Sequence, residues 1–513
     1  MERKRKTRRI RYIPARYILA MLITVLEVVG IIGAVIALCY YFRFFYLAAI
    51  ATHVLCVVKI VSSDDNPDYK VPWLLTVMGL PVVGFMLYFL FYSRSFKRKF
   101  LRRLEELQTR GYEYDDTRAT AALARERAPI EGDLRMLCRI ADTHLFQNTA
   151  TTYFPLGEDL HRAMLADLRA AEHFIFMEYF IIERGVFWDS ILEILREKAR
   201  AGVTVKILYD DVGCMKTLPG NYTRVLARDG IECLPFSRLR GNADSEFNNR
   251  NHRKITVIDG RVGFTGGVNL ADEYINARVR FGHWKDTGLR LEGAAVYELT
   301  RLFLLDFGVS KRKTELPELA LYPDFSDVVG SGYVVPFGDG PRPLYRHRVT
   351  KSAIRNLFAS ARRYVYMTTP YLIIDNDLCT CIENAAMRGV DVRIILPHIP
   401  DKRLIFEITQ SYYARLLSAG VGIYEYTPGF IHAKSYLCDD SVAIVGTVNL
   451  DYRSLVHHFE NGVLLYRCDA IADLKADLCA TLAASEQIPR ASSRPRLWRR
   501  MLRATLRVFA PLM

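Results

Sequence analysis

The sequence predicts an α/β protein in which two tandem α/β domains, with mixed sheets flanked by helices, follow an N-terminal helical transmembrane region. Three observations predict this fold. A block of twenty residues, Asn251–Leu270, recurs as Ile431–Leu450 at an offset of 180 residues. Buried-strand patterns alternate with helical patterns around both copies of the block, which is typical of α/β domains. Long apolar runs without a helix-period polar face occupy the first hundred residues.

The N-terminal region, residues 1–95, contains apolar runs at about 17–42, 44–61 and 71–92. The first and third are each long enough to cross a bilayer, which requires about 20 apolar residues. Basic residues flank the region on both sides, and the positive-inside rule places both flanks in the cytoplasm. We therefore expect an even number of crossings, with the middle run lying at the interface or re-entering; the alternative is that all three runs cross and one basic flank lies outside. Residues 96–149 are predicted to be a linker.

The duplicated body follows, with predicted domains at 150–330 and 331–489. Buried strands are expected at 173–182 and 363–374, and each is followed about twenty residues later by a helix end, a glycine and a Val/Ile-rich strand. Such nearly continuous apolar strands are typical of sheets covered on both faces. Within the repeated block, two strands are separated by a tight turn and end in a glycine-rich turn. Each half is therefore a complete α/β unit.

Charge is concentrated outside this body. Residues 1–103 carry 17 Lys/Arg and 5 Asp/Glu, and residues 490–513 carry seven Arg and no acid, which leaves −5 of the net +14 for residues 104–489. A nucleic-acid enzyme would carry positive charge on the catalytic body. The excess instead flanks apolar segments, which indicates anionic lipid headgroups. The tail at 490–513 is predicted to be a basic amphipathic helix on the membrane surface.

The repeated block carries a set of polar residues suited to phosphoryl chemistry. The matching pairs are His252 and His432, Lys254 and Lys434, Asp259 and Asp439, Gly266 and Gly446, and Asn269 and Asn449. A histidine can act as nucleophile or proton carrier, while lysine and asparagine stabilise charge on phosphate oxygens. Two such sets around one phosphorus would let one histidine attack while the other protonates the leaving oxygen. The aspartates complete the catalytic motif, although their place at the far end of the strand favours a supporting role.

This duplicated HxKxxxxD pattern, followed by GGxN or GTxN, resembles the signature of the phospholipase D superfamily. The stretches "FMEYFII", "HWKDTGLRLEG" and "FIHAKSYLCDDSVAIVGTVNLDYRS", together with the N-terminal apolar runs, are similar to bacterial cardiolipin synthases. The resemblance implies phosphatidyl transfer between two phosphatidylglycerol molecules, giving cardiolipin and glycerol through a phosphohistidine intermediate. It also implies that His252 is the nucleophile and His432 the general acid and then base, although the sequence leaves that order open.

The resemblance implies further site residues. Asn269, Asn449, Gly267 and Thr447 would surround the substrate phosphate, with Gly267 in the place of the serine common in the superfamily. Glu460 lies 28 residues after His432, where relatives place a carboxylate that orients the imidazole. The same offset in the first half gives Arg280, so Asp286 is the expected carboxylate for His252.

The alternatives are a membrane phospholipase D that uses water as acceptor, a transferase with another headgroup donor or acceptor, a nuclease of the superfamily, and an inactive lipid-binding scaffold. The charge distribution argues against a nuclease, and the presence of both histidines and both lysines argues against a scaffold. We expect no metal ion, no cofactor and no nucleic-acid partner. The expected location is the bacterial cell membrane, as a multi-pass protein, and the sequence does not indicate an oligomeric state.

Overall fold

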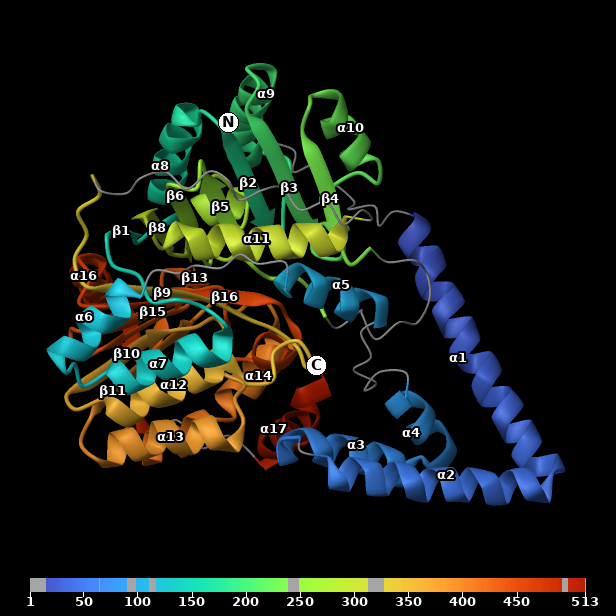
Figure 1. Ribbon diagram of the computed structural model, residues 1–513. Helices are drawn as coiled ribbons and strands as arrows, with labels where there is room; N and C mark the ends of the chain where they lie inside the picture. The colour runs from blue at the N-terminus through green and yellow to red at the C-terminus, as the bar shows by residue number, and fades with distance from the viewer. Residues whose placement is uncertain are drawn as a thin grey trace, which may run out of the picture.

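The computed structural model describes residues 15–63, 65–89, 98–109, 117–238, 249–311, 327–490 and 497–512. Two α/β units are stacked on each other, and an arm of N-terminal helices projects from one side (Figure 1). The predicted α/β duplication with mixed sheets and flanking helices is confirmed.

The first unit is built on a seven-stranded sheet with the order β1-β8-β6-β5-β2-β3-β4. Its strands are β1 (Thr149–Phe154), β2 (Phe174–Tyr179), β3 (Thr204–Asp210), β4 (Glu232–Phe236), β5 (Lys254–Ile258), β6 (Val262–Gly266) and β8 (Gly288–Gly293). Strands β2, β3 and β4 are parallel, and the other pairs are antiparallel. Its helical elements are α8 (Gly157–Ala170), α9 (Val186–Arg200), α10 (Tyr222–Arg228), the 3-10 helix η3 (Asp272–Ile275) and α11 (Val296–Ser310).

The second unit repeats this order strand for strand and adds one edge strand, giving β17-β12-β11-β10-β14-β15-β16-β9. Its strands are β9 (Tyr333–Asp339), β10 (Tyr364–Thr368), β11 (Asp391–Pro397), β12 (Gly422–Tyr426), β14 (Ser435–Cys438), β15 (Val442–Gly446), β16 (Glu460–Tyr466) and β17 (Ser485–Gln487). Its helices are α12 (Val349–Ser360), α13 (Asn376–Met387), α14 (Arg403–Gln410), α15 (Tyr413–Ser418), the π-helix η4 (Arg453–His457) and α16 (Ala470–Ala483).

The two units share one apolar core, which fixes their relative position. Side chains of β8, such as Leu289, belong to the same buried cluster as Val445 of β15 and Val463 of β16. Helix α11 is buried along its length from Val296 to Val309 and contacts strands of both sheets. Two short strands, β7 (His283–Lys285) and β13 (Gly429–Ile431), pair in parallel across the units. A site formed at this boundary is therefore built on rigid elements from both halves.

The segment predicted to be a linker contains three helices, α5 (Arg98–Thr109), α6 (Arg118–Glu126) and α7 (Glu131–Ala141). Helix α7 has apolar residues at helical spacing, and it buries Leu134, Leu137 and Ala141 against α12 and β9. Helix α5 packs on α11. These contacts attach the chain leaving the N-terminal arm to both units.

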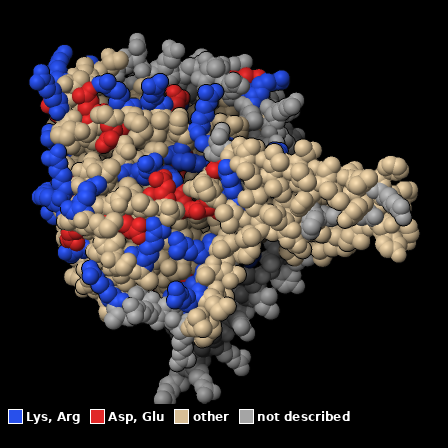
Figure 2. Space-filling model, turned by 90° about the horizontal axis from the view of Figure 1, so that it is seen from below, with Lys and Arg blue, Asp and Glu red and all other residues tan. Residues whose placement is uncertain are grey.

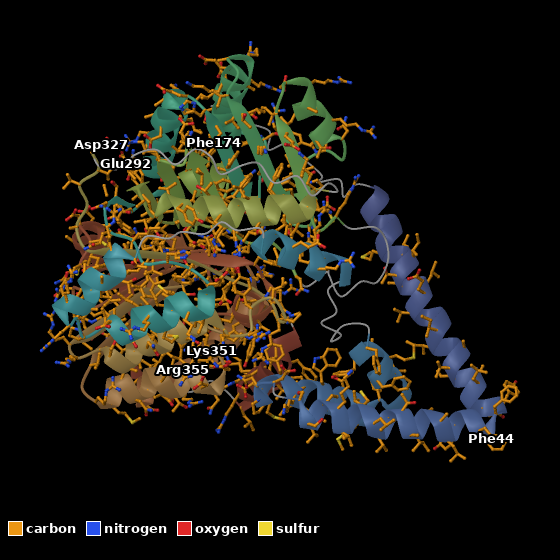
Figure 3. The ribbon with its side chains drawn as sticks, viewed as in Figure 1. Phe44, Phe174, Glu292, Asp327, Lys351 and Arg355 are labelled. Carbon is orange, nitrogen blue, oxygen red and sulfur yellow. The ribbon has the colours of Figure 1, made fainter. Side chains whose placement is uncertain are left out.

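The arm consists of α1 (Ala15–Tyr41), α2 (Arg43–Ser62), α3 (Pro67–Gly79) and α4 (Pro81–Leu87). Among the described residues, one helix is long and apolar enough to cross a bilayer, with the stretch Met21–Leu38 at a mean hydropathy of 2.6 and no part of it buried. Phe44, at the tip of the arm, is 89 % exposed and points away from the body (Figure 3). A second helix, α2, has a shorter apolar stretch, Tyr46–Ser62.

The predicted crossing at 71–92 is not a single helix. It is broken at Leu80, because Pro81 lacks the N–H that would continue the backbone hydrogen bonds. Helix α3 also buries Trp73 and Val77 rather than presenting them outward. The prediction of a multi-pass protein is therefore not supported by the described residues, of which residues 90–92 are not part.

The C-terminal helix α17 (Leu497–Phe509) and the 3-10 turn η6 (Ala510–Leu512) return to the arm and contact α3. The basic face of α17 is turned toward the body, where Arg503 pairs with Glu407 of α14. Its apolar face, including Trp498 and Met501, is exposed.

Candidate active site

Each motif histidine lies at the boundary between the two units, a few residues before a central strand: His252 two residues before β5 and His432 three residues before β14. The main-chain N–H of His252 donates to the carbonyl of Phe459 at 2.8 Å, and that of His432 donates to the carbonyl of Lys285 at 2.7 Å. Each histidine is thereby held by the backbone of the opposite unit. The side chains of His252, Lys254, His432 and Lys434 are all buried, with exposures of 6, 1, 7 and 1 %.

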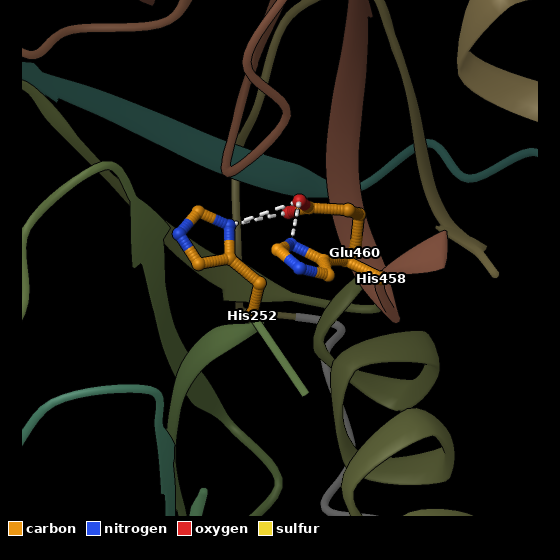
Figure 4. Close-up of side chains that lie close together, drawn as sticks. All are labelled: His252, His458 and Glu460. Atoms are coloured by element: carbon orange, nitrogen blue, oxygen red, sulfur yellow. Dashed lines mark hydrogen bonds and ion pairs between the residues drawn. The ribbon is translucent and has the colours of Figure 1, made fainter. Parts of the chain in front are cut away.

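The histidine side chains pair with carboxylates across this boundary. Nδ1 of His252 lies 2.9 Å from both carboxylate oxygens of Glu460 (Figure 4). Nδ1 of His432 lies 2.6 Å from Oδ2 of Asp286. The expectation that Glu460 orients His432 and that Asp286 orients His252 is therefore wrong, because each carboxylate serves the histidine of the other unit.

Asp286 and Glu460 nevertheless occupy equivalent places in the duplicated fold. Strand β6 pairs Gly266 with Gly288, and strand β15 pairs Gly446 with Gly462. Each carboxylate lies two residues before the second glycine of its pair. The connection from Gly266 to Gly288 spans 22 residues and that from Gly446 to Gly462 spans 16, so the first unit contains six extra residues. This insertion is why the constant offset led to Arg280.

The residues at 267 and 447 lie directly beside these carboxylates. The Thr447 hydroxyl donates to Oε2 of Glu460 and receives the N–H of Asn461 at 3.0 Å. A side chain at Gly267 would place its Cβ 2.0 Å from Oδ1 of Asp286. Position 267 therefore has no room for a side chain, because the Asp286 carboxylate occupies the space where it would lie.

Burial sets the ionisation of the histidine and carboxylate groups. It lowers the pKa of His252 to about 3. Burial also opposes ionisation of Glu460, but the His252 imidazole and the nearby His458 together hold the pKa of Glu460 below its usual range. A neutral His252 that donates its Nδ1–H to an ionised carboxylate leaves Nε2 with a free lone pair. Burial, and then the charges of Lys434 and Lys254, lower the pKa of His432.

The lysines supply the positive charge of the site. Burial lowers the pKa of Lys254 to about 7 and that of Lys434 to about 8. Each Nζ donates to the carbonyl of the histidine two residues before it, at 2.7 Å for Lys254. Nζ of Lys434 also lies 2.7 Å from Nδ1 of His432, a contact without a counterpart at Lys254. Burial raises the pKa of Asp286 to about 6, against the opposing charge of Lys434.

The two asparagines differ in their surroundings. Oδ1 of Asn269 accepts the N–H of Ile181 at 3.1 Å, and its amide donates to the Tyr274 hydroxyl at 2.8 Å. Oδ1 of Asn449 is buried without a hydrogen-bond partner among the described residues. Asn269 therefore ties its turn to the chain around Ile181 and Tyr274, whereas the amide oxygen of Asn449 is left without such a partner among the described residues.

Asp259 and Asp439 lie at the opposite ends of their strands from the histidines. Seven residues of extended chain separate each from its motif histidine, or about 20 Å. Asp259 accepts the main-chain N–H groups of residues 172–174, and Asp439 accepts those of residues 362–364. Both aspartates are predicted from the sequence to complete the catalytic motif, but the structure places them away from the histidines. They anchor the starts of β2 and β10, in the supporting role that their position in the sequence suggested.

The structure adds two aromatic residues that the sequence did not single out. Trp284 lies two residues before Asp286, and its ring centroid is 5.5 Å from that of His432. His458 lies two residues before Glu460, and its ring centroid is also 5.5 Å from that of His252. The sequence does contain a signal for His458: it precedes Glu460 by two residues, as Trp284 precedes Asp286. This shared spacing becomes apparent once the two carboxylates are aligned.

His458 also completes a group that could hold a metal ion. Ligand atoms of His252, His458 and Glu460 lie within 4.8 Å of one another (Figure 4). Two imidazoles and a carboxylate form a donor set that Zn²⁺ accepts. An ion there would compete with Glu460 for Nδ1 of His252. The sequence indicated no metal cluster, since His252 and Glu460 are 208 residues apart.

Two α/β units that together present two histidines and two lysines define a phospholipase D-like enzyme. Comparison with known proteins agrees. A family model described as "Cardiolipin synthase, PLD-like domain" matches residues 164–279 and 354–480, and one described as "Phospholipase_D-nuclease N-terminal" matches residues 53–91. The crystal structure of phosphatidylserine synthase from Haemophilus influenzae has the same fold, with a TM-score of 0.55 at 15 % identity over 74 % of this chain and 97 % of the other.

Full-length relatives identify the family. A cardiolipin synthase of Halalkalibacterium halodurans is 34 % identical over 90 % of this chain and 92 % of its own length. An uncharacterized protein of Streptococcus mutans is 38 % identical over 89 % of this chain and 99 % of its own. The chain belongs to the cardiolipin synthase family of phosphatidyltransferases, and it is a membrane protein that acts on phospholipids.

Proposed function

We propose that the enzyme joins two phosphatidylglycerol molecules into cardiolipin and releases glycerol, through a phosphohistidine intermediate at the boundary between the units. The observation that carries this proposal is the crossed pairing of His252 with Glu460 and His432 with Asp286. It supplies two imidazoles, each oriented through Nδ1, as a double displacement at one phosphorus requires.

In the first step, Nε2 of His252 attacks the phosphorus of one phosphatidylglycerol. The bond between phosphorus and the headgroup oxygen breaks. His432, which takes up a proton from solvent when the anionic phosphate binds beside it, gives that proton to the oxygen, so glycerol leaves. We assign the attack to His252 because its Nδ1 faces both oxygens of an ionised carboxylate, which increases the electron density at Nε2. His432 shares its Nδ1 between Asp286 and Lys434, a different environment that suits proton transfer.

In the second step, the roles of the groups reverse. His432 takes the proton from a headgroup hydroxyl of the second phosphatidylglycerol, and that oxygen attacks phosphorus as the bond to Nε2 breaks. The product is cardiolipin, and His252 and His432 return to their starting protonation states. Lys254, Lys434 and the side-chain N–H groups of Asn449 would donate to the non-bridging oxygens, where charge concentrates in both transition states.

The partners follow from this reaction and from the arm. The substrate is a phospholipid, and we propose phosphatidylglycerol in the bacterial cell membrane. A nucleic acid is not expected, since residues 104–489 carry a net charge of −5. Helix α1 would cross the bilayer, and passage by further segments of the arm, which a multi-pass arrangement needs, remains a proposal.

The test is a product assay on the purified full-length protein in mixed micelles with labelled phosphatidylglycerol and no nucleotide. Cardiolipin and glycerol in equal amounts are the expected products. Phosphatidic acid without cardiolipin would mean hydrolysis and would overturn the proposal. After an alkaline quench, mass spectrometry should find the phosphatidyl group on the peptide that contains His252; finding it on the His432 peptide would exchange the two roles.

Variants separate the site from general damage to the fold. His252→Ala and His432→Ala should each abolish nearly all turnover, because residues that act as a unit cost about as much singly as together. His173→Ala is the matched control, because this histidine is exposed, directly precedes β2 and is not part of the candidate active site. Substantial cardiolipin synthesis by either motif variant would exclude the two-histidine mechanism.

A further inference from the structure

A cavity of about 1110 Å³ lies between the C-terminal helix α17, the arm helix α3 and the helices α14 and α15 of the second unit. None of the residues that line the cavity belongs to the candidate active site. Its volume is slightly above the usual range for small-molecule sites, roughly 300–1,000 Å³. The cavity is therefore large enough for a phospholipid headgroup and the first part of its acyl chains.

Three arginines of α17 line this cavity: Arg500, Arg503 and Arg507. Nε of Arg503 donates to Glu407 at 2.8 Å, and the guanidinium of Arg507 lies 4.3 Å from the centroid of the Tyr412 ring. Among the described residues, the structure records no hydrogen-bonding partner for Arg500. The planar guanidinium group of an arginine presents N–H donors in a fork, which matches the oxygens of a phosphate.

One carboxylate, Asp68 at the start of α3, also lines the cavity. Its Oδ2 accepts the main-chain N–H of Asn376 at 2.8 Å and lies 3.4 Å from the Tyr452 hydroxyl. Asp68 is thus held by neutral donors and neutralises none of the three arginines directly. Because Glu407 neutralises Arg503, the positive excess around the cavity comes from Arg500 and Arg507 against Asp68, and it favours an anion.

The rim of the cavity is apolar and exposed. Leu497, Val71 and Val508 line the cavity and are 73, 46 and 36 % exposed. Exposed apolar residues continue along α17 at Trp498 and along α3 at Met78. Figure 2 shows the arm as a projection with few charged side chains on a body rich in them. An apolar rim around an arginine-lined floor matches a ligand with an anionic head and apolar chains.

We propose that this cavity binds the phosphate headgroup of an anionic phospholipid that does not react, at a second site separate from the active-site histidines. The arginines contact the phosphate, and the acyl chains lie against the exposed apolar residues of α3 and α17. The basic face of α17 then acts as one wall of a lipid site. This site does not depend on which reaction the histidines perform.

The test uses the full-length protein in a neutral detergent and phosphatidic acid with a fluorescent acyl chain, which has no headgroup alcohol to lose. Fluorescence anisotropy should show saturable binding. Arg500→Gln combined with Arg507→Gln should weaken it by about tenfold or more, since each charge-assisted hydrogen bond to phosphate is strong. Arg499→Gln is the matched control, because it removes the same charge from the same helix but does not line the cavity.

Each outcome decides the proposal. If Arg499→Gln weakens the binding of phosphatidic acid as much as the double variant does, or if the double variant does not weaken it, the lipid is only attracted diffusely to a basic helix. Either result would overturn the proposal. Equally tight binding of phosphatidylcholine would leave only an apolar surface, and full competition by glycerol 1-phosphate would mean a site for free phosphate. If the double variant unfolds, Arg500→Gln alone decides, because among the described residues Arg500 makes no recorded hydrogen bond or ion pair that the substitution would break. The readout is binding, so failure here leaves the cardiolipin assay unaffected.

Discussion

His252 and Glu460 are 208 residues apart in the chain, yet both oxygens of the Glu460 carboxylate lie 2.9 Å from Nδ1 of His252. His432 and Asp286 form the reciprocal pair. Neither unit of the duplication therefore contains a complete catalytic dyad. The site therefore forms only when the two units pack together through their shared core around α11.

The crossed pairs predict how loss of a carboxylate will affect turnover. Glu460→Gln and Asp286→Asn should each lower kcat by about 10²- to 10⁴-fold, because the imidazole loses the partner that fixes its tautomer. Attack by His252 and departure of glycerol belong to the same displacement, so both variants should slow the first burst of glycerol in rapid-quench kinetics. The variants should differ with the leaving group: a phosphatidyl donor whose leaving group needs no proton, such as p-nitrophenol, should restore the burst in Asp286→Asn but not in Glu460→Gln. Equal restoration in both variants would contradict the separate roles.

Gly267 should tolerate no side chain. In Gly267→Ser or Gly267→Ala, the new Cβ would lie 2.0 Å from Oδ1 of Asp286 and would displace that carboxylate from His432. We expect a loss of cardiolipin synthesis comparable to that of Asp286→Asn, with little change in thermal stability. Gly132→Ala in α7 is the matched control, since a Cβ there meets open space. An active Gly267→Ser enzyme would show that Asp286 can act from another position.

The pH dependence of kcat/KM should be bell-shaped and narrow. Asp286 must lose its proton, so activity should rise as the pH increases through about 6. Lys254 and Lys434 must stay charged, so activity should fall as the pH increases through about 7 to 8. Lys254→Arg keeps its charge at all these pH values and should move the alkaline limb upward. Lys351→Arg, outside the site, should leave the profile unchanged, and an unshifted limb in Lys254→Arg would remove Lys254 from this assignment.

His458 should make the enzyme sensitive to zinc without making it dependent on a metal. Because lysines supply the positive charge at the phosphate, a chelator should leave turnover unchanged. Added Zn²⁺ should inhibit by competing for Nδ1 of His252, using Glu460 and His458 as the other ligands. His458→Asn should reduce this inhibition at least tenfold while it retains turnover. Loss of activity on chelation would instead make the metal part of the mechanism.

Much of the site was predictable because its signal is local. His252 and Lys254 stand two residues apart, and the pattern recurs at a fixed offset with the same glycines, so one short stretch carries both the chemistry and its repetition. The strands could be predicted for the same reason, since their apolar runs are continuous over a few residues. The prediction of a crossing at 71–92 failed, because a hydropathy average does not show that Pro81 interrupts the helix.

The sequence by itself determined the duplicated α/β fold, the family and the four histidine and lysine positions. Each of these depends on residues that are neighbours in the chain or are related by a constant spacing. Only the tertiary structure decided which carboxylate serves which histidine, that His458 and Trp284 cover the two imidazoles, and that the arginines of α17 face a cavity. These relationships arise where the two units pack against each other and where the chain end meets the arm. Packing brings together residues hundreds of positions apart, and no periodicity in the sequence encodes which of them will meet.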